Sequence, residues 1–142
     1  MNNQRLFRTP DIASIILIRL MVGVVFLSEG IQKFLFPVDR GAGRFQKIGI
    51  PYLDFFGPFV GSFEIMCGLL ILFGFVTRLA AFPLFIIMLV AIASTKIDIL
   101  QQDGIWEMMH ASRTDWSMLL GSVFLLIMGG GKWSVDYQLS RA

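Results

Sequence analysis

The stretch IRLMVGVVFLSEGIQKFLF, residues 18–36, decides the class of this protein, because it is apolar enough for a membrane span and yet carries charged residues. These are Arg19, Glu29 and Lys33. Charged side chains are costly in lipid, so those found there face the protein interior, pair with one another or belong to a site. The stretch predicts a membrane helix whose charges need an explanation.

The composition of the whole chain also indicates a membrane protein. Of 142 residues, 56% are hydrophobic and 15% are charged, whereas soluble domains carry about 25% charged residues. The net charge of +2 is too small for a nucleic-acid-binding surface. The single cysteine, Cys67, excludes an intrachain disulfide and a four-cysteine cluster, and the single histidine, His110, excludes bis-histidine haem ligation. We therefore expect no metal site, and any redox cofactor should be organic or belong to a partner.

Four segments are apolar over lengths near the about 20 residues that a membrane helix needs. They span residues 12–36, 53–75, 79–97 and 116–129. The second and third are joined by a short turn around Val76 and Arg78, which predicts an antiparallel hairpin. The sequence thus predicts an all-α integral membrane protein, with residues 1–142 forming a single domain folded as a four-transmembrane-helix antiparallel bundle.

An even number of spans places both termini on one side of the membrane. An excess of basic residues normally marks the cytoplasmic side, but here each predicted side has five. The side of the termini has Arg5, Arg8, Arg78, Lys132 and Arg141, and the other has Arg40, Arg44, Lys47, Lys96 and Arg113. The count decides nothing, and cytoplasmic termini in a bacterial inner membrane are our working hypothesis.

The charges of the first span share a helix face with its small residues, since successive residues turn by about 100°. This face contains Arg19, Gly23, Phe26, Gly30 and Lys33, with Glu29 at its edge. At a rise of about 1.5 Å per residue, Arg19 and Lys33 are about 21 Å apart, near opposite ends of the hydrocarbon layer. Both can extend to the interfaces, and Glu29 can pair with Lys33. Structural and ligand-binding roles are therefore both open.

The second span repeats this arrangement, with Gly57, Gly61, Glu64 and Gly68 on one face. Small residues at this spacing let membrane helices approach closely, so we expect the first two spans to pack through their glycines. Glu64 lies near the middle of its span, where an acid costs about 2.5–3.5 kcal/mol. It must be protonated or paired, and we interpret it as a site residue.

Three motifs stand out in the sequence: FLSEGIQKFLFP (26–37), GIPYLDFFGPFVGSFEIMCGLLILFGFVTRLAA (49–81) and GGGKWSVD (129–136). They resemble the motifs of the DoxX family of small four-span membrane proteins. The matched positions are Gly30, Lys33, Glu64, Gly68, Thr77, Arg78, Ser134 and Asp136. The resemblance implies a four-helix bundle. It also implies a link to oxidoreductases, because the related DoxD-type proteins are subunits of a thiosulfate:quinone oxidoreductase, although other members are described as assembly or cargo factors.

Two functions of different class follow. In the first, the protein is a quinone-interacting membrane subunit of an oxidoreductase complex, with Glu64 and Lys33 as catalytic residues and a soluble partner that supplies electrons. The predicted ligand-binding residues are Arg19, Phe26, Glu29, Gly30, Gly61, Gly68 and Arg78, with Phe63 and Met66 as further wall. In the second, a non-catalytic factor assembles, sorts or stabilises other proteins in the membrane. Whether the protein is an enzyme, and whether it forms a homodimer, stays open.

Overall fold

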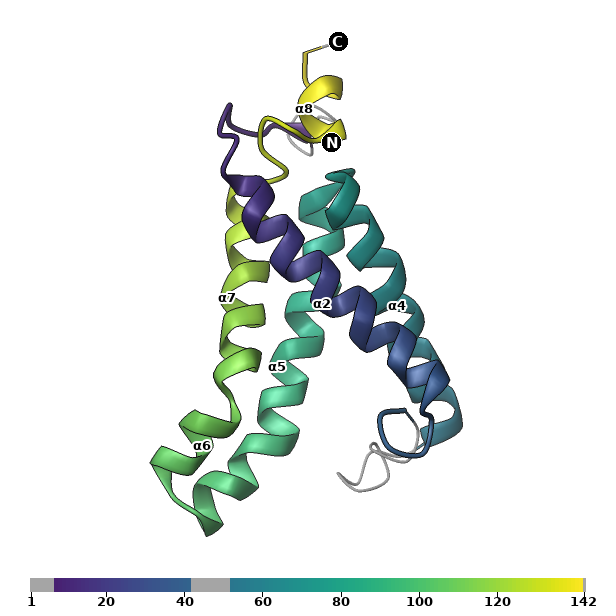
Figure 1. Ribbon diagram of the computed structural model, residues 1–142, viewed down its shortest axis with the longest axis vertical. Coiled ribbons are helices and arrows are strands. Elements are labelled where there is room, and N and C mark those ends of the chain that lie inside the picture. Colours follow the sequence, from purple (N-terminus) through teal and green to yellow (C-terminus); the bar gives the residue numbers. More distant parts are fainter. Residues whose placement is uncertain (1–6, 42–51, 142) are drawn as a thin grey trace.

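The computed structural model describes residues 7–41 and 52–141, and the regular structure in these ranges is entirely helical. Four long helices are joined in the order α2, α4, α5 and α7, with two short helices after α5 and after α7 (Figure 1). The bounds are α2 (Ile15–Leu35), α4 (Leu53–Phe73), α5 (Thr77–Gln102), α6 (Ile105–Ala111), α7 (Arg113–Met128) and α8 (Val135–Leu139).

The long helices pack as two pairs, α2 with α4 and α5 with α7, and the pairs spread apart toward the end that carries α6 (Figure 1). A tight turn joins α4 to α5, as the predicted hairpin requires. The segments next to the two termini meet at the same end of the bundle. There the backbone N–H of Gly131 donates to Thr9 Oγ1 (2.6 Å) and that of Lys132 donates to the Ile12 carbonyl (3.2 Å).

Three of the four predicted spans are confirmed as helices long and apolar enough to cross a membrane: Ile15–Leu35, Phe55–Phe73 and Thr77–Gln102. The third helix extends five residues beyond its predicted end at residue 97. The fourth span, predicted over residues 116–129, is not confirmed. Its helix α7 has 16 residues, which at about 1.5 Å each gives about 24 Å against a hydrocarbon layer of about 30 Å. Residues 42–51, between the first and second predicted spans, lie outside the described residues.

The predicted packing of the first two spans through their glycines is confirmed. A Cβ added at Gly68 would lie 3.0 Å from the Gly23 carbonyl oxygen, and one added at Gly30 would lie 2.7 Å from the Gly61 carbonyl oxygen. The α2 and α4 backbones therefore approach more closely at these two levels than any side chain would permit. This contact fixes the register between the two helices that contribute Lys33 and Glu64.

Gly30→Val should lower the free energy of unfolding by about 2 kcal/mol or more, because overpacking of a tight contact costs about 1–3 kcal/mol and the neighbouring atoms here include backbone. The matched control is Ser28→Val, which adds the same side chain to an exposed position of the same helix. Titration of both variants with sodium dodecyl sulfate in mixed micelles measures the difference. Equal stability of the two variants would contradict the close contact.

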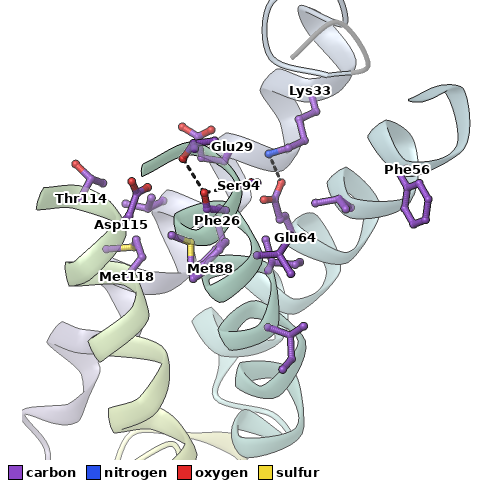
Figure 2. Close-up of a pocket in the computed structure, with 17 residues that line it drawn as sticks. Phe26, Glu29, Lys33, Phe56, Glu64, Met88, Ser94, Thr114, Asp115 and Met118 are labelled. Carbon is purple, nitrogen blue, oxygen red and sulfur yellow. Dashed lines mark hydrogen bonds and ion pairs between the residues drawn. The ribbon is translucent and has the colours of Figure 1, made fainter. Parts of the chain in front are cut away.

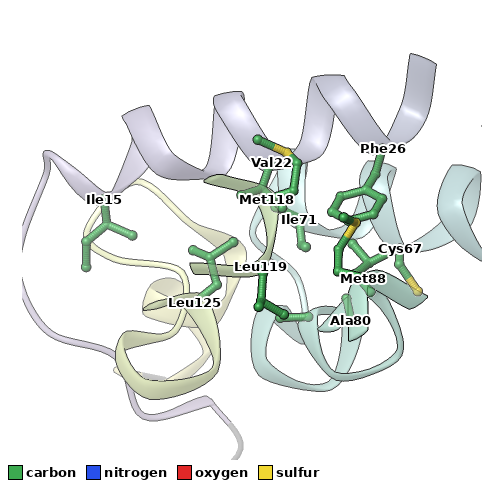
Figure 3. Close-up of a cluster of buried hydrophobic side chains, with 12 residues drawn as sticks. Ile15, Val22, Phe26, Cys67, Ile71, Ala80, Met88, Met118, Leu119 and Leu125 are labelled. Atoms are coloured by element: carbon green, nitrogen blue, oxygen red, sulfur yellow. The ribbon is translucent and has the colours of Figure 1, made fainter. Parts of the chain in front are cut away.

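The hydrophobic core fills the half of the bundle nearer the termini. Its buried side chains come from all four long helices (Figure 3). They are Ile15, Val22, Phe26, Cys67, Ile71, Ala80, Ala81, Leu84, Met88, Met118, Leu119 and Leu125. Phe26, Met88 and Met118 lie at the edge of this core and also line a cavity, so the cavity begins where the packed core ends.

Candidate functional site

A cavity of about 550 Å³ lies between the two helix pairs and is lined by all four long helices (Figure 2). Its volume is in the range of about 300–1,000 Å³ that is typical of small-molecule sites. Most of its wall is apolar and includes Phe26, Met88 and Met118. A few polar side chains interrupt this wall. Sites that bind and orient an apolar ligand usually combine an apolar lining with a few polar groups in this way.

An ion pair between Lys33 and Glu64 crosses from α2 to α4 at the cavity wall (Figure 2). Lys33 Nζ lies 2.6 Å from Glu64 Oε2, and the two side chains are only 9% and 5% exposed. The Lys33 stem reaches Glu64 by passing Gly61, where an added Cβ would lie 3.4 Å from Lys33 Cβ. The glycine contact between the helices thus makes room for the ion pair.

The structure resolves the question of how Glu64 is accommodated in its span. Charge pairing lowers the cost of a buried carboxylate, but each charge then depends on its partner, because removal of one leaves the other uncompensated. Among the described residues, the ion pair of Lys33 is with Glu64, and the pairing with Glu29 that the helix spacing permitted is not formed. Glu29 instead lines the cavity as a half-buried carboxyl group.

The other polar groups of the cavity come from α5 and α7. They are Ser94, Thr95, Thr114 and Asp115. All of them, with Lys33 and Glu29, belong to the parts of the long helices farthest from the termini, whereas the apolar wall adjoins the core. The cavity therefore has a polar end toward α6 and an apolar end toward the core.

Arg19 lies at the opposite end of the bundle and is 2% exposed. Its Nε donates to the Ile71 carbonyl (2.9 Å) and its Nη2 to the Leu72 carbonyl (2.5 Å), both in the last turn of α4. Its Nη1 donates to the carbonyls of Gly130 (3.2 Å) and Trp133 (2.5 Å) beyond α7. Carbonyls at a helix C-terminus lack intrahelical donors. Arg19 therefore caps the C-terminus of α4 and links the segment after α7 to it through hydrogen bonds.

Asp136 completes the same end of the bundle from the C-terminal segment. Its Oδ1 accepts from the Val76 N–H (2.7 Å) and its Oδ2 from the Thr77 N–H (2.9 Å), at the N-terminus of α5. Val76 has φ 43°, a left-handed conformation that a β-branched residue rarely adopts. The carboxylate satisfies the orphan donors of this strained turn and opposes the positive end of the helix dipole. Thr77 and Asp136 thus have a structural role, and Ser134 begins α8 (Val135–Leu139), where its Oγ accepts from the Tyr137 N–H (3.1 Å).

The structure places the predicted site residues in three groups. Lys33, Glu64, Phe26 and Glu29 line the cavity together. The glycines Gly30, Gly61 and Gly68 form the contact between α2 and α4. Arg19 and Arg78 lie at the far end, where Arg78 Nη2 donates to the Ile127 carbonyl (2.8 Å).

Two further residues of the predicted wall, Phe63 and Met66, do not line the cavity, and Met66 is half exposed. His110 is exposed on α6 beside Arg113 (2.9 Å). The cavity residues that the sequence did not single out are Ser94, Thr95, Thr114 and Asp115. Of these four residues, only Asp115 had a feature in the sequence that could have indicated a site, namely a charge at the end of an apolar segment. Among the described residues, no group of three or more His, Cys, Asp or Glu side chains is placed to hold a metal ion.

These features define a small multi-helix integral membrane protein with an internal ligand-sized cavity. The model of the DoxX family matches residues 14–97, which contain α2, α4 and most of α5 with the Lys33–Glu64 pair. The match covers more than half of the chain, and the protein belongs to the DoxX family.

Two relatives extend this comparison. The uncharacterized membrane protein Rv3486 of Mycobacterium tuberculosis is 52% identical over 143 residues, which cover 96% of this chain and 88% of the relative. CatD of Bacillus subtilis, named as a candidate oxidoreductase, is 25% identical over 121 residues, which cover 85% of this chain and 83% of the relative. No solved structure is significantly similar to the chain.

Proposed function

We propose that this protein is the membrane subunit of an oxidoreductase complex and binds a quinone in the cavity between its two helix pairs. The observation that carries the proposal is the buried Lys33–Glu64 pair (2.6 Å) at the polar end of an otherwise apolar cavity. A quinone has an apolar body and carbonyl oxygens that accept hydrogen bonds. The apolar wall of the cavity can contact the body of the quinone, and the Lys33 ammonium can donate to a carbonyl oxygen.

Reduction of a quinone to a quinol consumes two electrons and two protons. We propose that a soluble redox partner supplies the electrons and that Glu64 and Lys33 hold and transfer protons at the ring oxygen, as buried and partnered acid–base groups do in other enzymes. Phe26, Met88 and Met118 form an apolar wall of the same cavity. The name of the Bacillus subtilis relative, a candidate oxidoreductase, supports the same class of activity.

The alternative function is a non-catalytic factor that assembles, sorts or stabilises other proteins. Under this hypothesis the glycine faces would be packing surfaces and the charges internal pairs or partner contacts. The glycine face of α2 is already covered by α4, so it does not offer a partner a free surface. The cavity with its polar end also has no part in such a role, and we therefore favour the quinone-binding function. We place the protein in the bacterial inner membrane with cytoplasmic termini.

Native mass spectrometry of the protein, extracted gently from its own membranes, tests the proposal. A bound mass equal to that of a membrane quinone is expected, together with a soluble redox subunit or without it. The matched comparison is the double variant Lys33→Met/Glu64→Met, which removes both members of this ion pair. Loss of the bound mass in this variant supports the site, whereas a ligand-free wild type that carries other membrane or exported proteins supports the assembly function.

A further inference from the structure

A second ion pair adjoins the cavity on the wall opposite Lys33 and Glu64. Asp115, in the first turn of α7, lines the cavity, and its Oδ2 lies 3.0 Å from Lys96 Nζ of α5. The Lys96 and Asp115 side chains are 13% and 23% exposed. Each helix pair is therefore joined at the cavity by one lysine–carboxylate pair. Figure 2 shows Asp115 on the other side of the cavity from Lys33 and Glu64.

The polar groups of the cavity are mostly acceptors of hydrogen bonds. Glu29, Glu64 and Asp115 contribute carboxyl groups to the lining, whereas Lys33 is its one ammonium. The hydroxyls of Ser94 and Thr95 already donate to the Ala91 carbonyl, at 3.3 Å and 2.6 Å, and so present only oxygen lone pairs. Ionised carboxylates accept and do not donate. The Thr114 hydroxyl can donate or accept, so the Asp115 carboxylate is the group of the α5–α7 wall that needs a donor from the ligand.

We infer that Asp115, held in place by Lys96, is a second ligand contact and makes the cavity selective for the quinol over the quinone. The inference rests on the proposed function. A quinol has hydroxyl groups at opposite ends of its ring. One donates to the carboxylate of the Lys33–Glu64 pair and the other to Asp115. A quinone accepts from Lys33 at one end, but its second carbonyl oxygen faces the Asp115 carboxylate, which cannot donate to it.

Calorimetric titration of the purified protein in detergent, without oxygen, tests the inference. The probes are tetramethyl-1,4-benzoquinone and its quinol, and protein-free micelles give the blank. Wild type should bind the quinol about tenfold more tightly than the quinone, because hydrogen bonds to charged acceptors are the stronger ones. Asp115→Asn offers both a donor and an acceptor and should abolish this preference. Asp11→Asn is the matched control, since Asp11 is also ion-paired (Lys132, 3.2 Å) but lies at the other end of the bundle.

Lys96→Gln separates a ligand contact from a purely structural ion pair. It leaves the Asp115 carboxylate in the cavity, so the preference for the quinol should persist in this variant and be lost only in Asp115→Asn. Equal loss in both variants, or an unchanged preference in Asp115→Asn, overturns the role of Asp115. If neither variant folds, wild type alone decides, because equal affinity for the two forms also overturns it. Binding of neither form by wild type overturns the proposed function itself.

Discussion

Arg19→Met should lower the free energy of unfolding by about 3 kcal/mol or more, because several buried backbone carbonyls lose a donor at once. The substitution fills similar space but leaves carbonyls of α4 and of the segment after α7 without their donor. An unsatisfied buried carbonyl costs about 1–3 kcal/mol. The C-terminal segment would then lose its attachment to α4.

Titration with sodium dodecyl sulfate in mixed micelles measures this loss. The control Lys132→Met removes an exposed cation, paired with Asp11 at 3.2 Å, and should cost about 0–1 kcal/mol. Arg19→Lys should remain strongly destabilised, because a single ammonium cannot reproduce the planar fork that serves carbonyls on two segments. Equal stability of Arg19→Met and Lys132→Met would contradict the role of Arg19.

The same variant distinguishes a structural Arg19 from a ligand-binding one. Arg19 lies away from the cavity, so the folded fraction of Arg19→Met should bind a quinone with the affinity of wild type. A large loss of quinone affinity in folded Arg19→Met would show that Arg19 does contribute to ligand binding. We therefore separate Arg19 from Lys33, although both lie on the same face of α2.

Helix periodicity predicted the glycine contact but not the partner of Lys33. Spacing along one helix assigns residues to faces, and on α2 it made Glu29 the available partner. The partner was decided by the register between α2 and α4, which depends on how Gly30 and Gly61 meet. That contact takes the Lys33 stem past Gly61 to Glu64. No pattern within either helix contains this information.

The acceptors of Arg19 also could not be predicted, because they are backbone carbonyls. Every residue has a carbonyl, so the sequence around Ile71 or Trp133 carries no sign of the contact. Asp136 was found only through its place in the motif GGGKWSVD, and its capping of α5 needed the fold. The fourth span was predicted from its apolar residues alone. Its helix, α7, begins at Arg113 and has 16 residues, which is short for a helix that crosses a membrane.

The Lys33–Glu64 pair gives the prediction with the largest functional effect. Glu64→Gln should lower quinone-linked turnover by about 100-fold or more, the smaller end of what loss of an acid–base group costs. Glutamine keeps the length of the side chain and still offers an oxygen to Lys33, which lies 2.6 Å from the carboxylate, but it cannot exchange a proton at neutral pH. The buried Lys33 ammonium then lacks its counter-charge, so the amount of protein in the membrane should fall below that of wild type, and turnover is compared per molecule.

Quinone-dependent oxidation in membrane vesicles, divided by the amount of protein on an immunoblot, measures this effect per molecule. Glu107→Gln is the matched control, because it makes the same change on an exposed face of α6 outside the cavity. Reduced abundance or partner association with normal turnover per molecule would favour the assembly function. Normal turnover and normal abundance together would remove Glu64 from the mechanism. Loss of turnover per folded molecule would mean that the carboxyl group is kept in the membrane for its proton, because glutamine still offers Lys33 an oxygen but cannot transfer a proton.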